Sequence, residues 1–408
     1  FMFQNLVFLK KVERQMINPY GSSVLNPRFV SHPQERLELV REASRLPSMM
    51  LNTSSAANVV MLGAGYFNPL EGFMGLSEAL KCAEKMQAKN GLFWPIPIIN
   101  VCKDISAIKN TKRVSLLDPN TDDNRAIAIM EIENIEPVTR EQLNVMAKHI
   151  FTTTDLAHPG VSTLMGLGSH VVSGKLQVLD YSYYQSNFPE TFQTAYQIRD
   201  KIGVLGWQKV VAFQTRNPMH LAHEELCRIA MEREAADGVI VHMLLGKLKQ
   251  GDIPAHVRDS CIRLVAEGYF PKNKMLVSGY GFDMLYAGPR EAILHAIVRQ
   301  NMGASHLIVG RDHAGVGSYY GAFDAQEIFK NKQVREALDI DIFCADHTAF
   351  SKKLGSVVMI SEVKDHDESD FLFISGTKLR EMLANGIKPP GEFCRPEVAS
   401  MLIKHYRS

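Results

Sequence analysis

The sequence is poor in cysteine, lacks a long hydrophobic run and carries almost no net charge. Its six cysteines are scattered over 408 residues, and no two stand at C-x-x-C spacing, which argues against a disulfide framework or a zinc knuckle. We therefore expect reduced thiols and a cytoplasmic protein. No stretch approaches the roughly 20 apolar residues of a membrane helix, so we expect no membrane partner. The net charge of +1 favours no nucleic-acid partner, and any anion site must be local.

The N-terminus does not have the pattern of a signal peptide. Residues 1–15 place an apolar run before Lys10 and Lys11, whereas a signal peptide has its positive charge first. Met16 opens the segment Met-Ile-Asn-Pro-Tyr-Gly, which resembles a natural start. We expect residues 1–15 to be an upstream extension or a cloning remnant.

Residues 16–185 lack a regular alternation of strands and helices. Short apolar runs are broken by glycine, proline and Asp-Pro turns, which is typical of a compact, mostly β domain with a few helices. The apolar runs are Asn58–Leu62, Trp94–Val101 and Arg125–Ile132, and the expected helices are Leu76–Gln87 and Arg140–Ile150.

The pattern changes in residues 186–345, where continuous apolar strands alternate with helices. The expected strands are Lys209–Gln214, Gly238–Leu245, Lys274–Ser278 and Ser305–Val309, and the expected helices are Pro218–Arg233, Ala255–Tyr269 and Pro289–Asn301. Strands without polar alternation predict a parallel sheet covered on both faces, and therefore an α/β catalytic domain. Ligands of such sheets bind beyond the carboxyl ends of the strands.

Residues 346–408 are expected to form a small appended α/β domain. It has a short strand at Val357–Ile360 and a charged stretch at 364–370 that is typical of a solvated loop. Ser375 is a candidate cap for the helix that follows, and Gly386 is expected to end that helix.

The first polar cluster, Gln214–His223, follows a predicted strand. Asn217 is a preferred N-cap and Pro218 suits the first helical position, so the helix is expected to begin there. The free N–H groups of a helix start favour an anion, and the Arg216 guanidinium matches sulfate or phosphate. His220 and His223 would project from one face, so this cluster predicts a site for a polyanion such as a nucleoside triphosphate. A metal half-site at the two histidines, or a plain salt bridge at Arg216, are the alternatives.

The second cluster, Gly310–Gly317, also follows a predicted strand and supplies Arg311 as a second cation. Its spacing is neither G-x-G-x-x-G nor a P-loop, so a dinucleotide fingerprint and a P-loop kinase or GTPase are not indicated. A structural glycine loop, with Arg311 paired to Asp312 or Glu327, is the alternative.

Together these residues resemble the ATP sulfurylase (sulfate adenylyltransferase) family. Gln214–His223 matches its signature Q-x-R-N-P-x-H-x-x-H, and Gly310–Gly317 matches G-R-D-H-A-G-x-G. Further similar segments are Gly65–Met74 (G-x-F-x-P-L-x-G-F-M), Trp94–Ile98 (W-P-I-P-I), Ala287–Ala292 (A-G-P-R-E-A) and Ile374–Arg380 (I-S-G-T-x-x-R). The likeness extends through most of the chain.

The resemblance implies a β-rich PUA-like N-terminal domain, a Rossmann-like nucleotidyltransferase domain with a parallel sheet, and a small C-terminal domain. It implies in-line attack of sulfate on the α-phosphorus of ATP, which gives adenosine 5′-phosphosulfate and pyrophosphate in a reversible reaction. The roles implied are catalysis by Thr215, Arg216, Asn217, His220 and His223; sulfate contacts from Gln214, Arg216 and Ala314; and ATP contacts from Gln214, Thr215, Arg216, Asn217, Gly310, Arg311, Asp312, His313 and Val358. Mg²⁺ is expected to arrive with ATP, without a metal held tightly by the protein, and the chain is expected to form a homodimer.

Two departures from related patterns refine the interpretation. Related nucleotidyltransferases carry H-x-G-H, whereas Ala222 precedes His223 here, which fits ATP sulfurylases better. The chain stops soon after the C-terminal module, so we expect the single-function bacterial type without an adenylylsulfate kinase domain. Another adenylyltransferase of the superfamily and a PUA-type RNA-binding protein are the alternatives; the long N-terminal region argues against the first, and the lack of a basic patch argues against the second.

Overall fold

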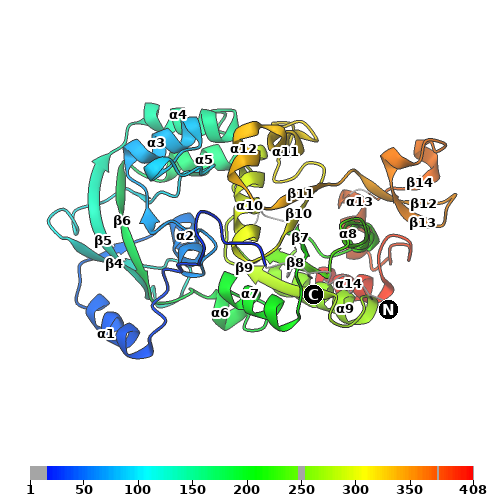
Figure 1. Cartoon of the computed structure of the whole chain (residues 1–408), viewed down its shortest axis with the longest axis horizontal. Helices are drawn as coiled ribbons and strands as arrows, with labels where there is room; N and C mark the ends of the chain where they lie inside the picture. The colour runs from blue at the N-terminus through cyan, green and yellow to red at the C-terminus, as the bar shows by residue number, and fades with distance from the viewer. Residues whose placement is uncertain (1–15, 247–252, 375, 408) are drawn as a thin grey trace, which may run out of the picture.

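The computed structural model describes residues 16–246, 253–374 and 376–407 (Figure 1). In Figure 1 the N-terminal sheet lies at the left, a parallel sheet occupies the centre, and a small antiparallel sheet lies at the right. The expected extension at residues 1–15 and the expected cap Ser375 lie outside the described residues. No helix among the described residues is long and apolar enough to cross a membrane.

The N-terminal part contains a six-stranded sheet in the order β1-β4-β5-β6-β2, with β3 also paired to β6. Its strands are β1 (Ser48–Met50), β2 (Gly72–Phe73), β3 (Val101–Cys102), β4 (Arg113–Leu117), β5 (Ala126–Pro137) and β6 (His170–Val178). Its helices are α1 (Pro33–Ala43), α2 (Thr53–Gly63), α3 (Leu76–Lys85), α4 (Arg140–Phe151) and α5 (Pro159–Gly166), and the connecting helices are α6 (Tyr184–Asn187) and α7 (Ala195–Val204). The predicted mixture of strands and a few helices is confirmed.

Two of the apolar runs of this part lie largely outside the strands of the sheet. Asn58–Leu62 lies inside α2, which begins after Asn52, whose side chain accepts from the Ser55 amide at 2.8 Å. Because nearly every side chain of α2 is buried, the helix lacks the polar face that distinguishes a helix from a strand in the sequence. The run Trp94–Val101 contains two prolines and joins the sheet only at Val101–Cys102.

The central sheet is parallel throughout, as predicted, with the order β11-β10-β7-β8-β9. Its strands are β7 (Val210–Thr215), β8 (Gly238–Leu244), β9 (Met275–Tyr280), β10 (His306–Val309) and β11 (Asp341–Cys344), and its helices are α8 (Leu221–Arg233), α9 (Ala255–Tyr269), α10 (Pro289–Asn301), α11 (Asp324–Glu327) and α12 (Lys332–Ala337). The chain leaves β7 toward β8 on one side and returns to β10 on the other. The carboxyl ends of β7 and β10 therefore flank a topological switch point, where sheets of this kind bind ligands.

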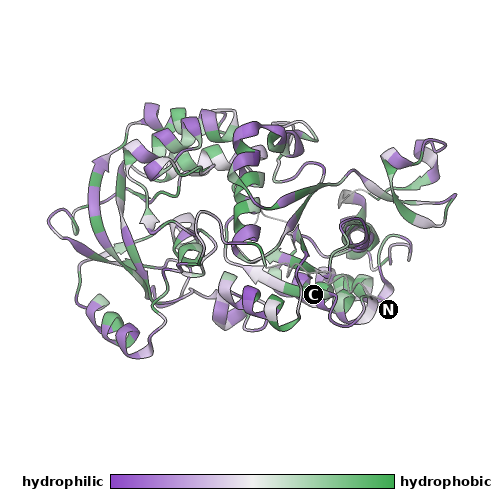
Figure 2. Ribbon diagram, in the orientation of Figure 1, coloured by the Kyte–Doolittle hydropathy of each residue, from purple (hydrophilic) through white to green (hydrophobic). Residues whose placement is uncertain are grey.

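Helix α10 lies between the N-terminal part and the central sheet (Figure 1) and is buried from Glu291 to Asn301. Its polar side chain Asn301 is hydrogen-bonded to the N-terminal part, whereas Arg299 Nε and Nη2 have no hydrogen-bond partner among the described residues. Asn301 accepts from the Tyr20 amide at 2.8 Å and donates to the Tyr66 and Asn68 carbonyls at 2.8 and 3.1 Å. The buried apolar residues of both parts form one continuous cluster, and Figure 2 shows hydrophobic colour along the central strands. Helix α10 therefore joins the two parts into one packed unit.

The C-terminal segment adds an antiparallel sheet and two helices. They are β12 (Thr348–Ser351), β13 (Ser356–Met359), β14 (Phe371–Leu372), α13 (Gly376–Ala384) and α14 (Pro396–Arg407). Gly386 has φ +71° and its amide donates to the Leu383 carbonyl at 3.0 Å, so it ends α13 as predicted. Helix α14 packs back on α9, which fixes the end of the segment on the central domain.

Candidate functional site

The two polar clusters meet in one cavity at the switch point of the central sheet. Residues 213–217, which end β7 and follow it, and residues 310–314, which follow β10, line a cavity of about 390 Å³ together with His220 and His223. The predicted meeting of the two loops is therefore found. Because β7 and β10 are neighbours in the sheet, both loops emerge at the same edge.

The helix after β7 begins later than predicted. Helix α8 starts at Leu221 with His220 at the N-cap position, in an extended conformation, so Asn217 is not the cap and Pro218 is not the first helical residue. The Thr215 hydroxyl explains the delay. Its Oγ1 donates to the Asn217 carbonyl at 2.8 Å and accepts from the Asn217 amide at 3.0 Å, which closes a turn that competes with the helix. The turn leaves Asn217 exposed at the rim of the cavity.

His220 and His223 form a stacked pair at the start of α8. Their ring centroids are 3.8 Å apart with planes tilted by 25°, and the Phe393 ring also stacks on His220, at 5.1 Å between centroids. Burial lowers the pKa of His223 to about 4 and holds the pKa of His220 well below its usual value. The Nδ1 atoms of both rings are buried without a hydrogen-bond partner among the described residues. Two neutral imidazoles with unused nitrogens beside a helix start suit an oxyanion ligand.

Arg216, which follows β7, contacts Tyr286. Its guanidinium carbon is 5.4 Å from the centroid of the tyrosine ring, and Nη1 donates to the hydroxyl at 3.4 Å. Tyr286 precedes α10, so the orientation of this arginine depends on a segment that the sequence pattern did not single out. Arg216 also lines a second, adjoining cavity of about 370 Å³ together with Arg311 and His313.

The loop after β10 has a compact, partly left-handed backbone. Asp312, Ala314 and Gly317 have φ of +54°, +55° and +53°, conformations that cost free energy in residues other than glycine. Arg311 Nε lies 3.3 Å from Asp312 Oδ2, and the two side chains are 48% and 62% exposed. The pairing considered as the alternative for Arg311 is thus present, but an exposed pair of this kind contributes only about 0–1 kcal/mol and does not hold the arginine rigidly.

His313 lines the cavity and also contacts the buried His295. Its Nε2 lies 3.0 Å from His295 Nδ1, and burial lowers its pKa to about 3. Ala314 is buried and its carbonyl accepts from the Gly288 amide at 3.0 Å. The loop is therefore anchored to α10 and to the segment before it.

A third loop, which sequence reasoning missed, completes the wall of the cavity. Asp346, His347 and Thr348 follow β11 and line the cavity beside the first two loops. Strand β11 is only Asp341–Cys344 and begins with an exposed residue, so its short apolar stretch did not stand out. The polar residues after β11 could have revealed this loop, because the carboxyl ends of neighbouring parallel strands lie at the same edge of the sheet.

An apolar cavity of about 360 Å³ adjoins the polar one and shares His220, Ala222, His347 and Thr348 with it. Phenylalanine rings from β12, from the segment after β14 and from the segment before α14 form much of its lining: Phe350, Phe373 and Phe393. On β13 the cavity is lined by Val357. The predicted contact residue Val358 is the next residue of the strand, and neighbouring side chains of a strand point to opposite faces.

The histidine pair has no metal-site partners in the described part of the chain. Among residues 16–246, 253–374 and 376–407, no three His, Cys, Asp or Glu side chains cluster in a way that could hold a metal ion. The alternative of a metal half-site at His220 and His223 therefore gains no third ligand there.

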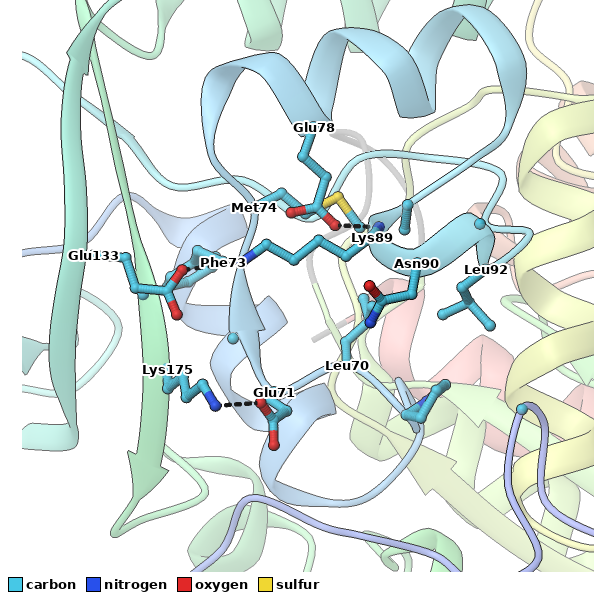
Figure 3. A pocket seen from close by; sticks show the side chains of 16 residues that line it. Leu70, Glu71, Phe73, Met74, Glu78, Lys89, Asn90, Leu92, Glu133 and Lys175 are labelled. Carbon is cyan, nitrogen blue, oxygen red and sulfur yellow. Dashed lines mark hydrogen bonds and ion pairs between the residues drawn. The ribbon is translucent and has the colours of Figure 1, made fainter.

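A separate cavity of about 550 Å³ lies in the N-terminal part, where residues 69–74 face β6 (Figure 3). Its charged side chains pair with one another. Glu71 lies 2.8 Å from the Lys175 ammonium, and Glu133 lies 3.1 Å from the Lys89 ammonium. Because each cation there already faces a carboxylate, this cavity is less suited to a polyanion than the one at the central sheet.

Comparison with known proteins agrees with this architecture. Residues 17–181 match the model of a PUA-like domain, and residues 189–405 match that of the ATP-sulfurylase family. The sulfate adenylyltransferase of Alcanivorax borkumensis is 55% identical over 96% of this chain and 98% of its own length, and that of Allochromatium vinosum is 54% identical over 96% and 99%. A solved structure, the hexameric APS kinase from Thiobacillus denitrificans, shares the fold with a TM-score of 0.74 at 21% identity, over 96% of this chain and 69% of its own. The chain therefore belongs to the ATP-sulfurylase family.

Proposed function

We propose that this chain transfers the adenylyl group of ATP to sulfate, releasing pyrophosphate and forming adenosine 5′-phosphosulfate, and that it catalyses the reverse reaction. The observation that carries the proposal is the cavity at the switch point, where Arg216 and Arg311 come from two loops and the stacked histidines from a third position. This reaction brings a dianion against a negatively charged triphosphate. A pocket that gathers cations and hydrogen-bond donors offsets the repulsion and fixes the line of approach.

On the sulfate side, Gln214, Arg216 and the backbone of Ala314 are the proposed contacts. Gln214 and Ala314 line the cavity together with Arg216, and the donors that they would offer to sulfate oxygens are the Gln214 side-chain N–H groups and the Ala314 backbone N–H. Sulfate is fully ionised, so no base is needed to deprotonate it. The role of these groups is to hold the nucleophile and to neutralise its charge.

On the nucleotide side, Thr215, Asn217 and the loop Gly310–His313 are proposed to contact the ribose and phosphates. His220 and His223 would donate hydrogen bonds to the α- and β-phosphate oxygens as pyrophosphate leaves. The apolar cavity beside His220 is the proposed adenine site, since flat phenylalanine rings suit a purine. Val357 lines this cavity, and a contact from Val358 stays a prediction.

Mg²⁺ is proposed to enter with ATP as part of the substrate. The carboxylates in the lining of the cavity are Asp312 and Asp346, and hard oxygen ligands of this kind suit Mg²⁺ when phosphate oxygens supply the other positions. The ion would neutralise phosphate charge.

The binding partners of the enzyme and its compartment are also part of the proposal. Its partners would be ATP, sulfate, adenosine 5′-phosphosulfate and pyrophosphate, with a second copy of the chain in a homodimer. All six cysteines are free, and five of them are buried, which supports a reducing compartment such as the cytoplasm.

The test uses ATP, Mg²⁺ and sulfate labelled with ¹⁸O at all four oxygens. Attack by sulfate on the α-phosphorus predicts a product that retains every label, because the bridging oxygen comes from sulfate. Arg216→Ala should lower the rate about a hundredfold or more, since it removes one oriented charge contact. A product without sulfate label, or an Arg216→Ala variant near the wild-type rate, would contradict the proposal. Arg335→Ala, on the distant short helix α12, is the control.

A further inference from the structure

The segment between β9 and α10 holds Tyr286 against Arg216 in a strained conformation. Tyr286 has φ +60° and Gly288 has φ +50°. A non-glycine residue in this region costs on the order of 1–3 kcal/mol, so surrounding contacts must fix it. The tyrosine ring is the surface on which the Arg216 guanidinium rests, with the hydroxyl accepting from Nη1 at 3.4 Å.

Two anchors of this segment come from the central domain. The buried Glu291 carboxylate accepts from the Leu285 amide at 3.0 Å and from the Ala287 amide at 2.9 Å, on either side of Tyr286. The Gly288 amide donates to the Ala314 carbonyl at 3.0 Å. The segment is thus tied directly to the loop that is proposed to touch sulfate.

The third anchor comes from the N-terminal domain. His158 is fully buried, and its Nδ1 accepts from the Gly160 and Val161 amides at 3.1 and 3.4 Å, where it caps α5. Since Nδ1 is an acceptor, the ring proton must be on Nε2. Nε2 donates to the Tyr286 carbonyl at 3.1 Å.

The same imidazole also contacts Tyr320, which follows the loop Gly310–Gly317. The Tyr320 hydroxyl lies 3.2 Å from His158 Nε2, and the Tyr320 ring covers Gly288, where an added Cβ would lie only 2.8 Å from it. Close packing continues at Gly160, where a Cβ would lie 2.4 Å from the Leu285 carbonyl. His158 therefore contacts the segment that carries Tyr286 directly, and it also contacts Tyr320, whose ring packs on Gly288 of the same segment.

We propose that His158 and Tyr286 are positioning residues that hold the Arg216 guanidinium in its sulfate-binding orientation. The N-terminal domain then completes the sulfate side of the site without touching the substrate. This inference rests on the proposed function, because it concerns how the same reaction binds its nucleophile.

The test separates the two hydrogen-bonding roles of His158. His158→Asn keeps an oxygen that can cap α5 but is too short to reach the Tyr286 carbonyl, whereas His158→Gln places an N–H donor near the position of Nε2. For His158→Asn we expect the KM for sulfate to rise about tenfold, with the KM for ATP changed less than about twofold, because a small misplacement of a binding group is costly. His158→Gln should recover part of the sulfate affinity. His149→Asn, on the exposed face of α4, is the matched control.

Tyr286→Phe is the second variant and covers the case in which His158 variants fold poorly. It removes the hydroxyl that accepts from Arg216 and should raise the KM for sulfate about threefold, a smaller effect than that of His158→Asn. Thermal unfolding is measured alongside. Folded His158→Asn and Tyr286→Phe proteins with wild-type sulfate KM, or with equal losses for both substrates, would overturn the inference. Absence of sulfate-dependent turnover in the wild-type chain would instead contradict the proposed function.

Discussion

At the scale of single residues, the cavity at the switch point contains two histidines whose pKa values are lowered by burial. His220 and His223 stack at the start of α8, and burial holds both pKa values below the usual value. In the free protein both rings are therefore neutral near neutral pH. Because the unfolded chain binds these protons more readily, the pair contributes stability that is lost as the pH falls from about 6.5 towards the His223 pKa of about 4.

This pair predicts that ATP binding takes up protons. Phosphate oxyanions beside the imidazoles favour the charged form and raise the histidine pKa values. Titration calorimetry at about pH 6, in buffers of different ionisation enthalpy, should reveal net uptake. The uptake should shrink in His223→Gln and persist in His405→Gln on α14. Net release, or no dependence on the buffer, would show that the rings do not face the phosphates.

Sequence reasoning was informative at this scale where residues lie at the ends of predicted parallel strands. The strand-end positions of Arg216, His223 and Arg311 predicted their common cavity, because parallel strands share one edge. The start of α8 was misjudged, since the Thr215 hydroxyl closes a turn that propensities alone do not reveal. The contact between His158 and Tyr286 spans 128 residues and leaves no local signal.

At the scale of elements, α10 is unusual because it is buried although it contains many polar residues. It is buried from Glu291 to Asn301, so its polar side chains need partners within the protein, although Arg299 Nε and Nη2 have no hydrogen-bond partner among the described residues. Asn301 is the clearest case, because its amide group serves three backbone groups of the N-terminal part.

Asn301→Leu should destabilise the protein strongly. The change keeps the side-chain size but leaves the Tyr20 amide and the Tyr66 and Asn68 carbonyls buried without this partner. At about 1–3 kcal/mol for each unsatisfied buried group, the free energy of unfolding should fall by about 3 kcal/mol or more. Chemical denaturation measures it, with Asn144→Leu on the partly exposed surface of α4 as control. A loss below about 1 kcal/mol would mean that the asparagine does not join the two parts.

Some helices and strands could be predicted from the sequence better than others. Strands β7 to β10 are buried along their length and read as continuous apolar runs, which made the parallel sheet predictable. Helix α2 is also largely buried, and its apolar run Asn58–Leu62 was counted among the features of a mostly β domain. Continuous burial removes the periodicity that separates the two structures.

At the scale of the whole molecule, the N-terminal domain and the central domain are packed as one unit. Its core is continuous with that of the central domain, and His158 links it to the segment beside Arg216. A PUA-like domain suggested an RNA-binding alternative in the sequence. Membership of the ATP-sulfurylase family and this contact favour a structural reason for its presence.

A crystal structure with bound adenosine 5′-phosphosulfate tests the central claim most directly. We predict density in the cavity between residues 214–217 and 310–314, with the sulfate group beside Arg216, the phosphate beside His220 and His223, and the adenine between the phenylalanine rings at the edge of β12. Density for the ligand elsewhere, for example in the N-terminal cavity of Figure 3, with the switch-point cavity left empty, would contradict the account.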